Sequence, residues 1–238
     1  MTVDPIDIRT VYPVRMSTRD RTVMVSRMVH NLRVMERTLT PSDVASGVGW
    51  YRVARRVIGS MAGVHGVTVS AMAGVVAAAS PRMSWYDNLR TADMVHRDRS
   101  TVTRLLPAAR RPVVDIMNGV RPLSTIRGSK SRSFYRNLYG DMAAATADIW
   151  MLRAAIGRPD VGDREYKFMD RVGGYSMVAT AIVDAAASSP WPVATAEYQA
   201  AIWTPYRARH SRWTDDRIDM TDVVSATAAI IGQTEDMS

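Results

Sequence analysis

Apolar side chains recur at helical spacing along most of this 238-residue chain, and this periodicity constrains the fold more than any other feature. A first example lies between residues 16 and 39, where the apolar positions are Val23, Met24, Met28, Leu32 and Met35. No stretch shows the two-residue alternation that is typical of a half-buried strand. The pattern therefore predicts an all-α protein.

The composition indicates a packed protein with a polyanionic partner. Hydrophobic residues make up 47% of the chain, and the net charge of +8 at pH 7 suits a polyanionic partner, although an arginine-rich composition alone could produce it. There are no cysteines, and the four histidines lack the spacing of metal ligands. We therefore expect a polyanionic partner, and we expect no metal site, no metal cluster and no other cofactor.

The most apolar run, residues 67–79, is only 13 residues long and rich in alanine and glycine. A membrane-spanning helix needs about 20 apolar residues, so this run is predicted to be a buried core helix. The N-terminal sequence MTVDPIDIRT contains two acids and has no apolar segment of the kind found in secretory signals. These features predict a cytoplasmic protein without a membrane partner.

The segment Ile126–Arg153 carries the most distinctive chemistry of the chain. Although Lys and Arg together number 31, the only lysines are Lys130 and Lys167. A primary amine can lose its proton and attack an electrophilic carbon, which a guanidinium does not do. Asp148 follows Lys130 by 18 positions and supplies a carboxylate within the same segment.

Local signals in this segment predict a helix, a turn and a second helix. Gly128 is predicted to open the first helix, with the hydroxyl of Ser129 capping its free amides. Thr146 or Asp148 is predicted to cap the second helix, which ends at Gly157. The amine and the carboxylate are thus both expected close to a helix N-terminus.

This combination resembles the core of the helix-hairpin-helix DNA glycosylases, the superfamily of endonuclease III and 8-oxoguanine glycosylase. The shared motif is Gly-x-Lys at a helix start, ending at Lys130, then Asp148, then Arg153 five residues later. The resemblance implies a two-lobed helical fold with a cleft between the lobes. One implied lobe is residues 66–157, and the other combines residues 1–65 and 158–238.

The resemblance also implies a chemistry. Lys130 would be the nucleophile of a DNA glycosylase/lyase, and Asp148 would assist departure of the base from a flipped nucleotide, so both side chains are expected to converge on one sugar. The implied DNA-binding residues are Arg127, Gly128, Ser129, Ser131 and Arg132. The implied base-pocket residues are Ser80, Pro81, Arg82, Trp85, Asn88 and Trp150.

Departures from the family pattern keep two alternatives open. Thr125 and Ile126 stand where the family has a proline and its first hairpin glycine, and Trp150 stands where histidine is common. Some bacteriophage proteins that resemble these glycosylases build modified thymines, so a phage DNA base-hypermodification enzyme acting in an infected bacterial cell is one alternative. The other is a non-catalytic DNA-binding protein, in which residue 130 binds phosphate. On a purely structural interpretation, Lys130 is a solvated side chain and Asp148 an ordinary helix cap.

The C-terminal part is predicted to contain two more helices. The first is expected to end before Pro205, and the second to run from about Thr221 to Ile231. Between them, Trp203 and Trp213 flank a basic patch formed by Arg207, Arg209 and Arg212.

Overall fold

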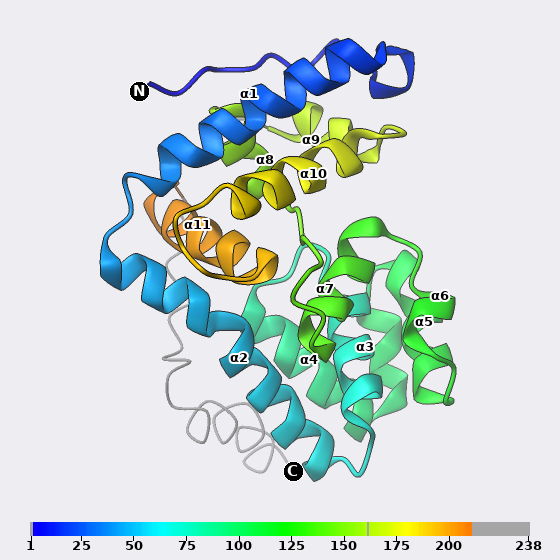
Figure 1. The fold of residues 1–238 in the computed structure, drawn as a ribbon. Helices are drawn as coiled ribbons and strands as arrows, with labels where there is room; N and C mark the ends of the chain where they lie inside the picture. The colour runs from blue at the N-terminus through cyan, green and yellow to red at the C-terminus, as the bar shows by residue number, and fades with distance from the viewer. Residues whose placement is uncertain (1, 161, 211–238) are drawn as a thin grey trace. The chain divides into compact units, whose positions relative to one another are not determined.

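The computed structural model describes residues 2–160 and 162–210, and within these residues the fold contains helices and no strand (Figure 1). The α-helices are α1 (Thr18–Glu36), α2 (Pro41–Val64), α3 (Val69–Ala79), α4 (Trp85–Arg97), α5 (Pro107–Met117), α6 (Pro122–Thr125), α7 (Ser129–Tyr139), α8 (Ile149–Ile156), α9 (Asp163–Asp170), α10 (Gly174–Ala187) and α11 (Thr195–His210). Two short 3₁₀ segments are η1 (Pro13–Arg15) and η2 (Arg99–Arg104). The predicted all-α class is confirmed for this part of the chain, while the helix predicted near residues 221–231 lies outside it.

The described residues divide into two compact units. Unit 1 comprises residues 2–50, 142–160 and 162–210, and unit 2 comprises residues 51–141. The divisions thus follow Trp50 and Asp141, whereas the resemblance implied divisions after residues 65 and 157. The first differs because α2 is one continuous helix that contributes residues to both units, and the second because α8 packs against α1, α10 and α11 of unit 1.

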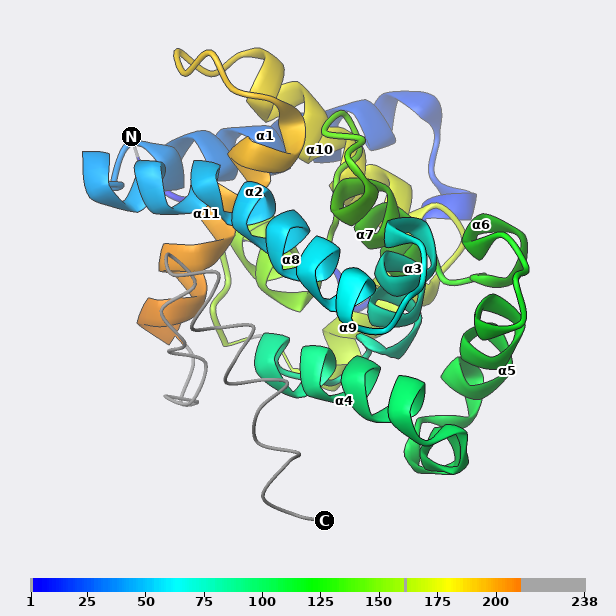
Figure 2. The ribbon, with the colours of Figure 1, turned by 90° about the horizontal axis from the view of Figure 1, so that it is seen from below.

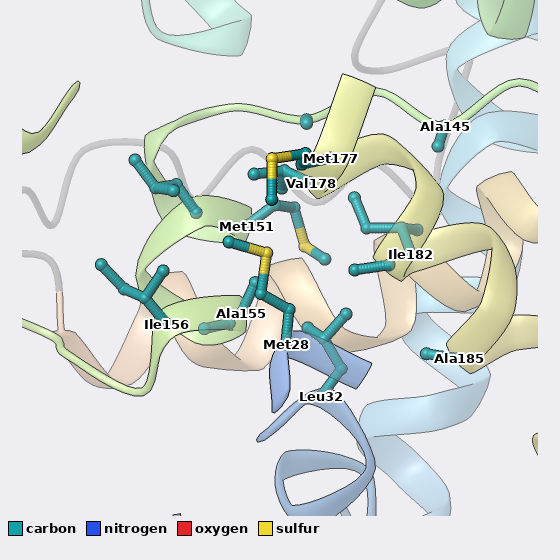
Figure 3. Packing of buried hydrophobic residues seen from close by; sticks show 14 of the residues in the cluster. Met28, Leu32, Ala145, Met151, Ala155, Ile156, Met177, Val178, Ile182 and Ala185 are labelled. Carbon is teal, nitrogen blue, oxygen red and sulfur yellow. The ribbon is translucent and has the colours of Figure 1, made fainter. Parts of the chain in front are cut away.

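Helices α1, α8 and α10 enclose a methionine-rich core in unit 1 (Figure 3). Its labelled side chains include Met28 and Leu32 from α1, Met151 and Ile156 from α8, and Met177 and Ile182 from α10. All six are buried, as their helical spacing requires. The unbranched thioether of methionine adapts to irregular gaps, which suits a core between helices whose small alanines leave uneven surfaces.

A buried asparagine on α1 fastens the extended N-terminal arm, residues 2–12, to unit 1. The Nδ2 group of Asn31 donates to the carbonyl oxygens of Asp4 (2.8 Å) and Ala155 (3.0 Å), and its Oδ1 accepts from the Asp4 amide (2.7 Å). The Ile6 amide donates to the last carbonyl of α8 at 2.9 Å, and the Ile6 side chain enters the core. The arm is therefore part of the unit 1 packing and not a loose tail.

We expect Asn31→Ala to lower the free energy of unfolding by about 2–4 kcal/mol, because it leaves backbone groups of Asp4 and Ala155 without partners. Urea denaturation measures this change. Thr22→Ala on the exposed side of the same helix is the matched control and should alter stability by less than about 0.5 kcal/mol. Equal effects of the two substitutions would contradict the structural role of Asn31.

Unit 2 is assembled around α3, whose residues from Met72 to Ala79 are all buried. Helices α4, α5 and α7 pack around it, as Figure 2 shows from below. Gly74 permits the close approach of α6, since a Cβ at this position would lie 2.6 Å from Cγ of Pro122. The apolar run at residues 67–79, which was predicted to form a buried core helix, contains α3, so that prediction is confirmed.

A buried carboxylate in unit 2 holds two basic side chains. Asp93 on α4 is fully buried, its Oδ1 lies 2.8 Å from Nε2 of His65, and its Oδ2 lies 3.0 Å from Nε of Arg97. The ring of His96 lies beside that of His65, with 5.2 Å between centroids, and its Nδ1 is 2.7 Å from the Ala92 carbonyl oxygen. Because a carbonyl only accepts, Nδ1 of His96 carries the proton in this arrangement.

Acid is expected to destabilise unit 2 through His96. Burial lowers the pKa of His96 below its usual 6.5, an effect that His65 and Arg99 reinforce and that the Ala92 carbonyl and Asp93 oppose. The unfolded chain therefore takes up this proton at a higher pH than the folded chain, and the free energy of unfolding should fall as the pH drops below about 6.5. Urea denaturation at several pH values measures the fall, which should be smaller for the His96→Gln variant than for wild type. The same pH dependence in both proteins would contradict this origin.

α11 continues through Pro205 to His210, although the sequence predicted its end before Pro205. A proline inside a helix removes one backbone hydrogen bond. Pro205 and Tyr206 are buried here, and Arg209 lies 3.5 Å from the Asp43 carboxylate at the start of α2. Tertiary packing in unit 1 thus outweighs the local preference of the proline.

Candidate functional site

Lys130 lies in the first turn of α7 in unit 2 and is partly buried. The N-cap of α7 is Gly128, with φ of −66°, and a glycine at the N-cap has no side chain that could cap the helix. The prediction that Ser129 caps the helix is therefore wrong. Ser129 is already the first helical residue, and the capping geometry requires an extended residue one position earlier.

The side of α7 that carries Lys130 also carries apolar residues. Phe134 follows Lys130 by four positions, which places both on one face of the helix. The Phe134 ring is buried and meets the ring of Trp85 on α4 edge to face, with 6.2 Å between centroids. Lys130 therefore shares a face with the core-facing aromatic and not with the exposed arginines of α7.

The predicted DNA-binding residues at this helix have different environments. The exposed members are Arg127, Gly128, Ser129 and Arg132. Ser131 is buried on the inner side of α7, so it does not present its hydroxyl at the surface as predicted. The Nη1 group of Arg132 donates to the carbonyl oxygens of Leu123 (2.6 Å) and Ile126 (2.9 Å), so this guanidinium already closes the preceding loop.

The predicted base-pocket residues belong to both units. Those of unit 2 are Ser80, Pro81, Arg82, Trp85 and Asn88, and the one of unit 1 is Trp150. Ser80 is buried and its hydroxyl donates to the Ala77 carbonyl at 2.9 Å, while Arg82 forms the following turn with φ of +62°. The buried Oδ1 of Asn88 has no hydrogen-bond partner among the described residues.

Asp148 in unit 1 is the N-cap of α8, which confirms one of the two predicted caps. Its Oδ1 accepts from the amides of Trp150 and Met151, both at 2.9 Å. Its Oδ2 accepts from the indole Nε1 of Trp203 on α11 at 2.8 Å. These three donors occupy three of the roughly four acceptor positions of a carboxylate.

Two aromatic–guanidinium pairs adjoin this carboxylate. The Arg153 guanidinium lies over the Trp150 ring, 4.5 Å from its centroid, and that of Arg207 lies over the Trp203 ring at 5.4 Å. Such cation–π contacts are strengthened where solvent is excluded. The set formed by Asp148 and these four side chains is called the Asp148 cluster below.

The surroundings of the Asp148 cluster restrict its movement. Trp50 meets Trp203 edge to face, with 5.7 Å between ring centroids and 73° between ring planes. Burial lowers the pKa of Arg207, and the negative charge of Asp148 opposes this shift. The cluster therefore combines a fixed carboxylate, indole rings and partly desolvated cations.

Sequence reasoning assigned Trp203 and Arg207 to a basic patch and missed their link to Asp148. Their spacing of four positions on a helix is the signal that predicts the cation–π pair. No local signal predicts the bond to Asp148, which lies 55 positions earlier in the chain. Of the other predicted members of the patch, Arg209 lies 3.5 Å from the Asp43 carboxylate, and Arg212 and Trp213 lie outside the described residues.

The described residues contain no group of three or more histidine, cysteine or acidic side chains that could hold a metal ion. In the same part of the chain, no single helix combines the length and apolar character needed to cross a membrane. Helices α2 and α3 meet that criterion only as a pair, across a bend of 114°.

A family model described as a family of unknown function, DUF7178, matches residues 15–210 of the chain. The match spans helices α1 to α11 and includes Lys130 and all residues of the Asp148 cluster. No curated protein and no solved structure matches the chain.

We expect Asp148→Ala to lower the free energy of unfolding by about 1–3 kcal/mol, since it removes the cap of α8 and leaves the Trp203 indole without its acceptor. Asp148→Asn should cost less, because asparagine is also a good N-cap. Urea denaturation measures both. Asp184→Ala, at an exposed acidic residue on α10 of the same unit, is the control; a loss no greater than in this control would contradict the capping role.

Proposed function

The chain belongs to the DUF7178 family, and we propose that it is a DNA glycosylase/lyase-like enzyme acting on a nucleotide turned out of the duplex. In this proposal Asp148 is the catalytic carboxylate and Lys130 the nucleophile. The two residues belong to different units, so their roles are argued and tested separately. The basic composition of the chain, with a net charge of +8, supports a nucleic-acid substrate.

The observation that carries the proposal is the fixed orientation of the Asp148 carboxylate. Positive charge develops on the sugar as a glycosidic bond breaks, and a carboxylate held in advance stabilises that charge without having to reorganise. Two backbone amides and one indole N–H hold Asp148 in this orientation. The partial exposure of Asp148 is compatible with access by a sugar.

The chemistry proposed for Lys130 is nucleophilic. Its neutral amine attacks C1′ of the sugar, forming a C–N bond as the bond to the base breaks, and the base leaves with the electron pair and takes up a proton. The sugar ring then opens to an imine, from which the 3′ phosphate can be eliminated. Lys130 lies partly buried in the first turn of α7, on the helix face that also carries Phe134.

A second candidate is a non-catalytic DNA-binding protein, and the same hydrogen bonds favour it. Three donors on Asp148 are also what a purely structural helix cap would have. The two candidates differ in what they require at residue 130. Phosphate binding accepts any cation there, whereas imine formation requires a primary amine.

Borohydride trapping on duplexes that carry an abasic site, a damaged base or a modified thymine tests the proposal. Wild type should form a covalent adduct with at least one duplex, and both Lys130→Gln and Lys130→Arg should abolish the adduct. Lys167→Gln is the matched control, because Lys167 is the other lysine of the chain and is exposed. Asp148→Asn should slow base release by about tenfold or more without loss of DNA binding.

Other outcomes would favour the alternatives. Binding to every duplex that weakens steeply with salt, without any adduct or base release, would support the non-catalytic protein. Trapping that persists in Lys130→Arg would exclude Lys130 as the nucleophile. An altered base that stays attached to its sugar, detected by mass spectrometry of the DNA, would indicate the base-hypermodification enzyme instead.

A further inference from the structure

We propose that Trp203 is a positioning residue for the Asp148 carboxylate, which orients it toward the sugar of the substrate. The inference rests on the proposed function and adds a residue to it. Trp203 lies on α11 and Asp148 at the start of α8, and the indole N–H joins the two helices at 2.8 Å.

The backbone cap alone leaves the orientation of the carboxylate incomplete. Both amide donors of α8 bind the same oxygen, Oδ1, so they fix one corner of the group. Coupled rotations about the Cα–Cβ bond and the bond to the carboxyl carbon can still move Oδ2 while Oδ1 keeps its place, because the terminal torsion of an aspartate is broad. The bond from Trp203 to Oδ2 removes this freedom and fixes the plane of the carboxylate.

The indole is itself held on two sides. The Arg207 guanidinium covers one ring face at 5.4 Å, and Trp50 meets the ring at 73°. Arg207 and Trp203 are one helical turn apart on α11, so the pair moves as one body with the helix. A side chain fixed in this way can hold another group in place at little entropic cost.

The neutral character of the donor also suits the proposed reaction. The two backbone amides and the indole that donate to Asp148 are uncharged N–H groups. They orient the carboxylate without adding a positive charge of their own. Arg207, whose guanidinium lies over the Trp203 ring, also interacts with the negative charge of Asp148.

The test replaces the donor and preserves the ring. Trp203→Phe removes the N–H group, and 3-benzothienylalanine at position 203 replaces the N–H by sulfur within a ring of nearly the same shape. Both variants should lower kcat for base release by at least about tenfold and change KM by less than about twofold, on whichever duplex of the trapping panel wild type processes fastest. Trp191→Phe is the matched control in unit 1, at an equally half-buried indole that packs on Tyr198, and should keep wild-type kcat.

A double-mutant cycle separates positioning from a general loss of structure. If Trp203 acts through Asp148, adding Trp203→Phe to Asp148→Asn should lower kcat no further. If the two substitutions instead lower kcat by independent factors that multiply in the double variant, the inference is overturned, even where each single variant is impaired. An active wild type together with fully active Trp203 variants would also overturn it and leave the proposed function standing.

A readout without DNA distinguishes failure of the inference from failure of the proposed function. In ¹⁵N spectra of tryptophan-labelled protein, the Trp203 indole N–H should exchange slowly with solvent, and Asp148→Ala should accelerate exchange by at least about tenfold. Unchanged exchange would show that the bond is not maintained and would overturn the inference whatever the activity. Slow exchange in a wild type that releases no base would instead reject the proposed function, and the positioning role with it.

Discussion

The carboxylate of Asp148 is the constraint on which much of unit 1 depends. It caps α8 through two backbone amides and reaches α11 through the indole of Trp203. Both helices also contribute to the unit 1 core, so one side chain joins a helix start, a helix pair and the packing behind them. A group that is fixed so firmly for structural reasons is also preorganised for chemistry.

The Asp148 carboxylate caps α8 and is also proposed to act in catalysis, so the stability of the fold and the proposed reaction depend on the same side chain. A catalytic carboxylate on a mobile loop would be easy to replace without loss of fold, but one at a helix N-terminus is not. The N-terminal arm extends the same arrangement to the other end of α8, where Asn31 accepts and donates bonds to the arm and binds the Ala155 carbonyl. α8 is thereby tied at its start by a charged cap and at its end by a buried amide.

Unit 2 obeys a different constraint, the near-complete burial of α3. Its small residues let neighbouring helices approach closely, most clearly where Gly74 meets Pro122. α7 packs on α3 and presents Lys130 at its first turn, on the face that it shares with Phe134. The environment of the lysine is therefore set by how α7 lies on an apolar helix, and not by the glycine that precedes it.

The sequence by itself determined the helical class and several helix ends, because those depend on residues within about one turn of each other. Gly140 and Gly157 end α7 and α8 with φ of +122° and +67°, and Asp148 begins α8, all as local signals indicate. Only the tertiary structure decided that α11 continues through Pro205, since the burial that outweighs the proline comes from other helices. It alone also decided that Asp148 is bound by an indole 55 positions away, because such a bond depends on how two helices pack and leaves no mark in the local sequence.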